Sequence, residues 1–117
     1  MSMDVSYASP KVMQYFDDFD KMKKRIGTNE TKIVKRRHNE LCAATSFSEY
    51  LALNLGKPHS LSHDLSDCFG VSITGNIRLV IKPLCEDRTP EALKNCIKSE
   101  VIGVVKYHEG KKEWLIP

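Results

Sequence analysis

The sequence predicts a single α+β domain over residues 1–117, in which an N-terminal strand and two to three helices pack on one face of a small, mainly antiparallel sheet. The chain has 117 residues, enough for one hydrophobic core and too few for two. Apolar residues recur at helical spacing before Gly56 and alternate with polar residues after it. A run of helices followed by a run of strands is typical of the α+β class.

The first element expected is a short strand, because residues 3–7 (MDVSY) alternate between apolar and polar. Ser9 and Pro10 are typical of a helix N-cap and a first helical position. Apolar residues then recur at helical spacing as far as Gly27, a residue that often ends helices. We therefore expect one helix between Pro10 and Gly27.

Two further helices are expected before the sheet. Thr28 or Asn29 caps the second, whose buried stripe comprises Ile33, Val34, Leu41 and Ala44. Ser46 and Glu49 fit a capping box, which predicts a short third helix. The apolar residues of that helix are Phe47, Leu51 and Leu53.

The stretch ITGNIRLVIKP, residues 73–83, places an arginine inside an otherwise apolar run. A two-residue loop in this hairpin would put the apolar rows of its strands on opposite faces. A three-residue loop over 74–76, with Asn76 left-handed, instead pairs Ile73 with Ile77, Val71 with Leu79 and Phe69 with Ile81. This register buries one clean face, so we expect Arg78 on the opposite face, displayed near Ser72 and Lys82.

The C-terminal part of the sheet is predicted from a second apolar run. Residues 84–99 are proline-containing and of mixed charge, so we expect an insertion with one or two helical turns around 91–96. Residues 101–105, VIGVV, predict a central strand. This strand leads into Lys106, Tyr107 and His108.

Composition places the chain among soluble globular proteins, with 41% hydrophobic and 28% charged residues. No apolar run approaches the roughly 20 residues of a membrane helix, and the first residues lack the basic and apolar regions of a signal peptide. The four cysteines form no C-x-x-C pair and lie in apolar segments. We expect a cytoplasmic protein with reduced cysteines and no contact with a membrane.

Positive charge is concentrated in one segment. Between Lys21 and Arg37 there are eight Lys or Arg residues and one acidic residue, Glu30. This concentration fits a surface that contacts a polyanion or an acidic protein. The alternative is a solvated face balanced by the nearby acids Asp17, Asp18 and Asp20.

Three separated motifs resemble a known family. They are His59-Ser60-Leu61, the turn Gly75-Asn76-Ile77-Arg78, and the strand end Tyr107-His108. In this order they resemble the RelE/ParE superfamily of bacterial type II toxins, and most closely its HigB-like "killer protein" branch. The segment TKIVKRRHNELCAATSFSEYLAL also looks like the second helix of that family and its successor. The likeness covers nearly all of the chain, most clearly from about residue 25 onward.

The resemblance implies ribosome-dependent cleavage of messenger RNA, with growth arrest that a cognate antitoxin relieves. We expect that antitoxin to be a helix-turn-helix protein of the HigA type. By matching position, the implied catalytic residues are His59, Arg78, Tyr107 and His108. We expect further contacts to RNA from Lys82, Lys106, Arg36 and Arg37.

The chain departs from the family pattern at two places. Members often carry Lys-Gly-Asp after the first histidine, where this chain has Ser62-His63-Asp64. They often carry an acid before the Tyr-His pair, where this chain has Lys106. These departures leave two alternatives open: a toxin-fold module that only binds an antitoxin, and a ParE-like gyrase poison without nuclease chemistry.

The residue types suit cleavage of RNA without a metal. The ribose 2′-hydroxyl attacks the adjacent phosphate, so the enzyme must accept a proton, stabilise the phosphate and donate a proton to the leaving oxygen. Imidazoles perform both proton transfers near neutral pH, and a guanidinium forks onto two phosphate oxygens. His59 and His63 with Asp64 and Cys68 superficially resemble a metal site, but they lie on no predicted helix, so neither metal nor cofactor is expected.

In a regular strand, Tyr107 and His108 point to opposite faces. For both side chains to reach one site, the strand must end or twist there. Glu109-Gly110 fits such an ending, and on this basis we expect both side chains in the site.

Overall fold

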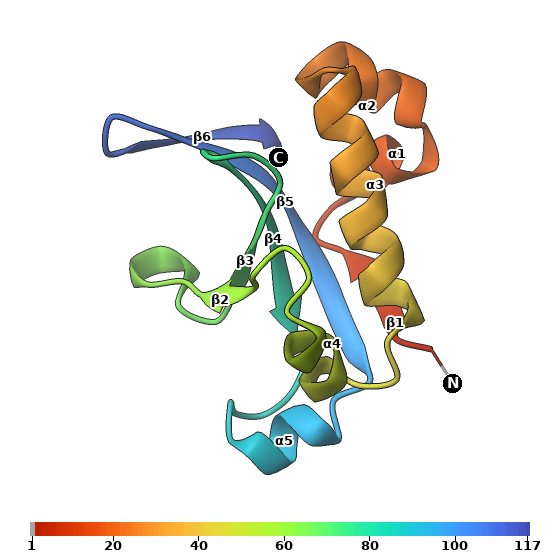
Figure 1. Cartoon of the computed structure of the whole chain (residues 1–117), viewed down its shortest axis with the longest axis vertical. Helices are drawn as coiled ribbons and strands as arrows, with labels where there is room; N and C mark the ends of the chain where they lie inside the picture. The colour runs from red at the N-terminus through yellow and green to blue at the C-terminus, as the bar shows by residue number, and fades with distance from the viewer. Residues whose placement is uncertain (1) are drawn as a thin grey trace.

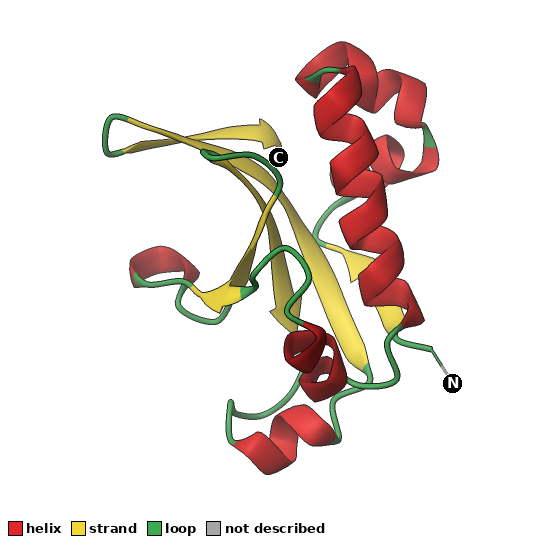
Figure 2. Cartoon of the chain, in the orientation of Figure 1, coloured by secondary structure: helices red, strands yellow, loops and turns green. Residues whose placement is uncertain are grey.

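The computed structural model describes residues 2–117 as helices stacked against a curved sheet (Figures 1 and 2). The helices are α1 (Pro10–Asp17), α2 (Phe19–Ile26), α3 (Thr28–Ala43), α4 (Phe47–Leu53) and α5 (Pro90–Lys94), with the 3-10 turn η1 at His63–Leu65. The strands are β1 (Asp4–Tyr7), β2 (His59–Ser60), β3 (Phe69–Ser72), β4 (Ile77–Pro83), β5 (Lys98–His108) and β6 (Lys111–Ile116). The predicted α+β class is confirmed.

Strand β5 organises the sheet, whose order is β1-β5-β4-β3-β2 with β6 also paired to β5. Along one edge β5 pairs with β4, and along the other it pairs first with β1 and then with β6. The β1–β5 pair is parallel and the other pairs are antiparallel, as the prediction of a mainly antiparallel sheet requires. None of the helices in residues 2–117 has the length and apolar composition that a bilayer crossing requires.

The expected single helix from Pro10 to Gly27 is wrong, because the chain breaks at Asp18. Its backbone is extended (φ −142°, ψ 90°), and its carboxylate accepts hydrogen bonds from the backbone N–H groups of Asp20 and Lys21. Asp18 therefore acts as the N-cap of a new helix, α2. The apolar spacing continues across this break, which is why periodicity alone did not reveal it.

The other helix starts were predicted with mixed success. Thr28 lies inside α3, and Gly27 occupies the cap position, so the expected Thr28 or Asn29 cap is wrong. The capping box of the third helix is confirmed, because the Ser46 hydroxyl accepts a hydrogen bond from the Glu49 N–H at 3.1 Å.

The predicted hairpin register is confirmed. Phe69 pairs with Ile81 and Val71 with Leu79, while the Ile73 N–H donates to the Ile77 carbonyl at 2.9 Å. The left-handed backbone expected at Asn76 is wrong, since φ is not positive there. Register depends on the apolar pattern of the strands and so survives an incorrect turn conformation.

Strand β6 was not predicted. Glu109 (φ 49°) and Gly110 (φ 78°) both adopt the left-handed region and join β5 to β6 in a two-residue turn. Two consecutive residues with positive φ suit the right-handed twist of a tight hairpin. The expected strand ending at Glu109-Gly110 is therefore a turn into a further strand.

The two faces of the sheet differ in what covers them. Helices cover one face, and the larger core lies between the helices and the sheet. The sheet contributes Val71, Leu79, Ile81, Val104 and Ile116 to this core. The opposite face has a small cluster in which Cys68, Val80 and Val105 are buried and Leu61, Leu65, Ile102 and Trp114 pack against them. In Figure 1 the β2 segment lies across the sheet from α3. The open side of this second face is available for a binding site.

Candidate functional site

A cleft of about 560 Å³ lies on the sheet face opposite the helices. Its walls come from the β2–η1 segment, the β3–β4 turn and the β5–β6 hairpin. The lining residues are His59, Ser60, Leu61, Ser62, His63, Asp64, Leu65, Gly75, Asn76, Arg78, Tyr107, Gly110 and Lys112. Three of the four predicted catalytic residues are among them.

Arg78 lies on β4 opposite Ser72 of β3 and Val105 of β5, on the face expected for it. Its Nη1 donates to the carbonyl oxygens of Thr74 at 2.7 Å and Ile77 at 3.1 Å, and its Nη2 donates to that of Gly75 at 3.3 Å. Within residues 2–117 it forms no ion pair with a carboxylate. The β3–β4 turn thus holds a cation whose charge is not neutralised.

Tyr107 reaches the cleft from β5, and its backbone N–H donates to the Asn76 carbonyl at 2.8 Å. The β5–β6 register is regular at this end, pairing Tyr107 with Lys112 and His108 with Lys111. Side chains of neighbouring strand residues point to opposite faces, so His108 lies on the other face from Tyr107. His108 is exposed and is not among the cleft residues.

His59 lies exposed on β2, with its Nδ1 3.2 Å from the carbonyl oxygen of Lys57. A carbonyl oxygen only accepts hydrogen bonds, so this contact requires a proton on Nδ1. In the neutral ring, Nε2 then carries the free lone pair. The local backbone therefore selects the tautomer that accepts a proton at Nε2.

His63 and Asp64 lie in the stretch Ser62-His63-Asp64, where the sequence departs from the Lys-Gly-Asp pattern. His63 has φ 59°, a left-handed conformation that favours glycine. The Asp64 carboxylate accepts a hydrogen bond from Lys112 Nζ at 2.6 Å, and this ammonium lowers the pKa of the Asp64 carboxyl. The ion pair joins the η1 wall of the cleft to β6.

The predicted RNA-binding residues are dispersed. Lys82 faces Glu100 across the β4–β5 pair, and Lys106 is paired with Ile77, one residue from Tyr107 and on the opposite face. Arg36 is exposed on α3. Lys82, Lys106 and Arg36 are not among the residues that line the cleft.

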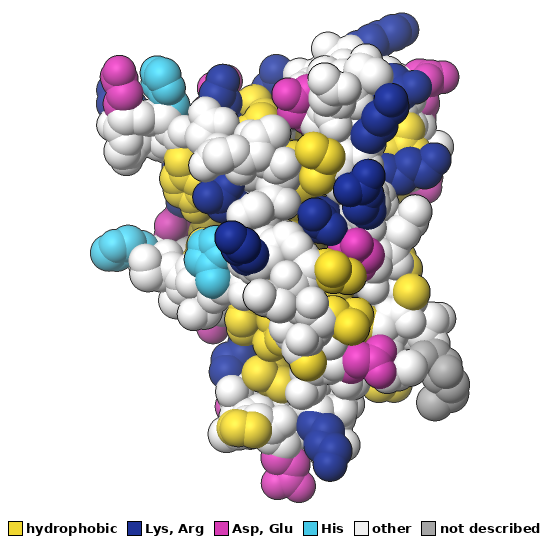
Figure 3. All heavy atoms as spheres, viewed as in Figure 1, with side chains coloured by type: hydrophobic (Ala, Val, Ile, Leu, Met, Phe, Trp, Pro, Cys, Tyr) yellow, Lys and Arg dark blue, Asp and Glu magenta, His cyan; other side chains and the backbone are white. Residues whose placement is uncertain are grey.

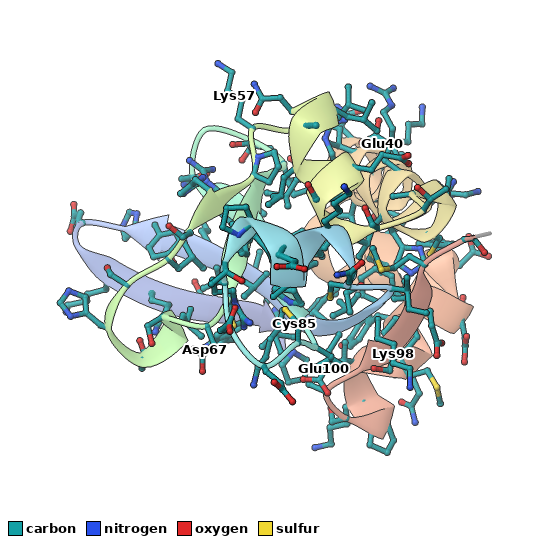
Figure 4. The ribbon with its side chains drawn as sticks, turned by 90° about the horizontal axis from the view of Figure 1, so that it is seen from below. Glu40, Lys57, Asp67, Cys85, Lys98 and Glu100 are labelled. Atoms are coloured by element: carbon teal, nitrogen blue, oxygen red, sulfur yellow. The ribbon has the colours of Figure 1, made fainter. Side chains whose placement is uncertain are left out.

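Arg37 contributes to a second cavity of about 480 Å³, next to the cleft. Its Nη1 donates to the Glu40 carboxylate at 2.8 and 3.1 Å, which offsets part of its charge. Lys57 also lines this cavity, and Arg78 and Gly75 line both cavities. Figure 4 shows Lys57 and Glu40 on either side of α4.

The surface over α2 and α3 is rich in Lys and Arg, which are the dark blue side chains in Figure 3. Histidine side chains are exposed over the β2 segment on the same view. Within residues 2–117 there is no cluster of three or more His, Cys, Asp or Glu side chains placed to hold a metal ion.

Sequence reasoning missed several cleft residues, notably Asn76, His63 and the β6 residue Lys112. The dipeptide Glu109-Gly110 between VVKYH and KKEWLI was a usable signal, because a two-residue Gly-containing turn predicts a hairpin. That hairpin would have placed Lys112 beside Tyr107.

No protein-family model matches this sequence, and no curated protein matches it. Among the solved structures that share its fold, two each align with 91% of this chain. One is the YoeB-YefM complex from Staphylococcus aureus, with 20% identity, a TM-score of 0.52 and coverage of 91% of this chain and 97% of that chain. The other is the YoeB/ParE toxin from Agrobacterium tumefaciens, with 16% identity, a TM-score of 0.51 and coverage of 91% and 99%. The expected RelE/ParE-like fold is confirmed.

Proposed function

We propose that this protein is the toxin of a type II toxin–antitoxin module and a ribosome-dependent, metal-independent mRNA endonuclease acting in the cytoplasm. One observation carries the proposal: the Arg78 guanidinium, unpaired with any carboxylate of residues 2–117, lines one cleft together with His59 and Tyr107. A fixed cation beside a proton acceptor is what attack by a 2′-hydroxyl on a phosphodiester needs.

Arg78 stabilises the charge that develops on the scissile phosphate. Three backbone carbonyls of the β3–β4 turn hold its guanidinium in place before substrate arrives. Preorganised charge of this kind typically accelerates reactions about a hundred- to thousandfold, because no reorganisation is needed in the transition state.

His59 accepts the 2′-hydroxyl proton. Its Nδ1–H is oriented by the Lys57 carbonyl, which leaves Nε2 as the acceptor. Tyr107 stacks on a base next to the cleavage point, as aromatic side chains commonly do with splayed single-stranded RNA.

The RNA strand continues past Arg78 into the second cavity, toward Lys57 and Arg37. The basic surface over α2 and α3, including Arg36, contacts ribosomal RNA. Because these contacts are to phosphates, association with ribosomes should weaken steeply as salt rises.

The partner is a cognate antitoxin, proposed to be a helix-turn-helix protein of the HigA type. Support for a protein partner, though not for its type, comes from the structural neighbour that was solved as a complex of YoeB with YefM. The HigB-like assignment itself depends on the motifs at His59, Arg78 and Tyr107-His108.

The test compares induced expression of the wild type, Arg78→Ala and a control, Lys98→Ala. Lys98 is exposed at the start of β5, far from the hairpin tip that borders the cleft (Figure 4). Wild type and the control should arrest growth and cut translated messages, whereas Arg78→Ala should lose at least a hundredfold in cleavage rate.

Other outcomes would reject the proposal in distinct ways. Equal toxicity of the three proteins would rule out the role of Arg78. DNA damage without RNA cleavage would favour a gyrase poison. A harmless wild type that still binds its antitoxin would favour the non-catalytic binding module.

A further inference from the structure

The cleft contains one residue whose backbone is in an unfavourable conformation. His63 has φ 59°, where a side chain with a Cβ is disfavoured and glycine is at ease. Such backbone strain persists only when the surroundings hold it, and it is concentrated at functional sites. Glycine at this position would remove the strain, so an imidazole here needs a reason other than folding.

The His63 imidazole is available for chemistry. It is exposed, lines the cleft, and forms no hydrogen bond with another group of residues 2–117. The neighbouring Asp64 carboxylate is engaged by Lys112 at 2.6 Å. The Asp64 carboxylate is therefore paired with Lys112 and not with the His63 ring.

The proposed reaction lacks one participant. His59 accepts the 2′-hydroxyl proton, but the leaving 5′-oxygen also needs a proton, and His108 is on the far face of the sheet. The side-chain hydroxyls that line the cleft belong to Ser60, Ser62 and Tyr107, and an imidazolium is a stronger acid than an aliphatic or phenolic hydroxyl.

We propose that His63 is the general acid of this cleft, an inference that rests on the proposed ribonuclease function. The bond from the 2′-oxygen to phosphorus forms while the bond from phosphorus to the 5′-oxygen breaks. His59 Nε2 takes the 2′-hydroxyl proton, and protonated His63 gives a proton to the 5′-oxygen. The products are a 2′,3′-cyclic phosphate and a 5′-hydroxyl end, and exchange with water resets both imidazoles.

The charged and titratable groups around the His63 imidazole come from every wall of the cleft. Asp64 lies on its own segment, Lys112 on β6, Arg78 on β4, Tyr107 on β5 and His59 on β2. The two cations among them, Arg78 and Lys112, also face the space where the phosphate would lie. Both cations therefore favour a bound phosphate in the cleft.

The decisive variant is His63→Gly, because glycine fits the left-handed backbone and folding should improve. The melting temperature should rise by about 2–5 °C, as expected when backbone strain is relieved in a domain of this size. Cleavage of an ordinary message on programmed ribosomes should fall about a hundredfold or more, the usual effect of losing a general acid. Added imidazole, which can occupy the vacated space, should restore part of the lost rate.

A substrate with sulfur in place of the 5′-bridging oxygen identifies the step. A thiolate leaves without protonation, so His63→Gly should cut this RNA within about threefold of wild type. His59→Ala should remain slow on both substrates, because its loss affects attack by the 2′-hydroxyl.

The matched control is Glu109→Gly, since Glu109 also has positive φ (49°) but does not line the cleft. It should gain stability and keep full cleavage. The inference is overturned if His63→Gly cuts the ordinary message at the wild-type rate, or if it is equally slow on both substrates. If wild type cuts neither RNA, the proposed function fails and this inference falls with it.

Discussion

At the scale of single residues, backbone carbonyls do much of the organising in the cleft. They hold the Arg78 guanidinium and select the tautomer of His59. A carbonyl positions a donor without neutralising a full charge, as a carboxylate would. Arg78 is therefore oriented and still carries a positive charge that a phosphate can use.

A second residue-scale feature is a half-buried histidine far from the cleft. The His38 Nε2 lies 2.8 Å from the Tyr7 hydroxyl, and its ring packs against Phe16 with centroids 4.8 Å apart. Burial lowers the pKa of His38, so the folded protein favours the neutral imidazole. At a pH below the ordinary pKa of histidine, the unfolded chain therefore binds a proton at His38 more readily than the folded chain does.

We therefore predict that the free energy of unfolding falls as pH decreases from about 7 to 5, within the range where unfolded histidine titrates. Replacing His38 with Phe should flatten this dependence, because the titrating group is gone. Urea unfolding at several pH values in this range measures the pH dependence of the free energy of unfolding. The same replacement at His108, exposed at the hairpin tip, should keep the wild-type slope; an unchanged slope in His38→Phe would contradict the assignment.

At the scale of elements, the pairing of β5 with its neighbours is irregular around Gly103. Its register with β4 shifts between Val80 and Ile81, and its register with β6 shifts between Val104 and Val105. Gly103 lies between these shifts, and a Cβ there would collide with the carbonyl oxygens of Ile116 and Pro117. The close approach of the C-terminal backbone requires a residue without a side chain.

Gly103→Ala should therefore destabilise the protein by about 1–3 kcal/mol, the usual cost of overpacking a core. The matched control is Gly75→Ala, because a Cβ at Gly75 meets no atom within 4 Å and its φ is not positive. Its stability should stay within about 0.5 kcal/mol of wild type. Equal unfolding midpoints in urea for the two variants would refute this account of Gly103.

At the scale of the whole molecule, one sheet separates two environments. Val104 belongs to the large core under the helices, and its neighbour Val105 belongs to the small cluster beneath the cleft. Both side chains are completely buried. Alternation along β5 thus gives one strand a stabilising face and a face that supports the site.

Shortening these two valines should separate stability from function. Val104→Ala and Val105→Ala should each cost about 1–3 kcal/mol, since each removes two buried methyl groups. Only Val105→Ala should also slow RNA cleavage, because it loosens the floor that supports Arg78 and Tyr107. Unfolding in urea measures the effect on stability, and cleavage rates on programmed ribosomes measure the effect on function. An equal loss of cleavage in both variants would contradict a specific role of Val105 in supporting the cleft.

Local chemistry made several features predictable. The α+β class followed from periodicity, the α4 start from the Ser46 capping box, and the β3–β4 register from two apolar rows that must share a face. The break at Asp18 was not predictable from the same signals, because an apolar pattern can continue through a kink. Strand β6 was missed because its turn, Glu109-Gly110, was interpreted as an ending.

The sequence by itself determined the fold class, the display of Arg78 opposite the helices, and the candidate chemistry of an arginine with imidazoles. Only the tertiary structure decided which imidazoles share a cleft with Arg78: His59 and His63 do, and His108 does not. The physical reason is that alternation fixes the face of a side chain only once the extent of the strand is known. The β5–β6 pairing, which extends β5 regularly through His108, is a long-range contact that no local pattern specifies.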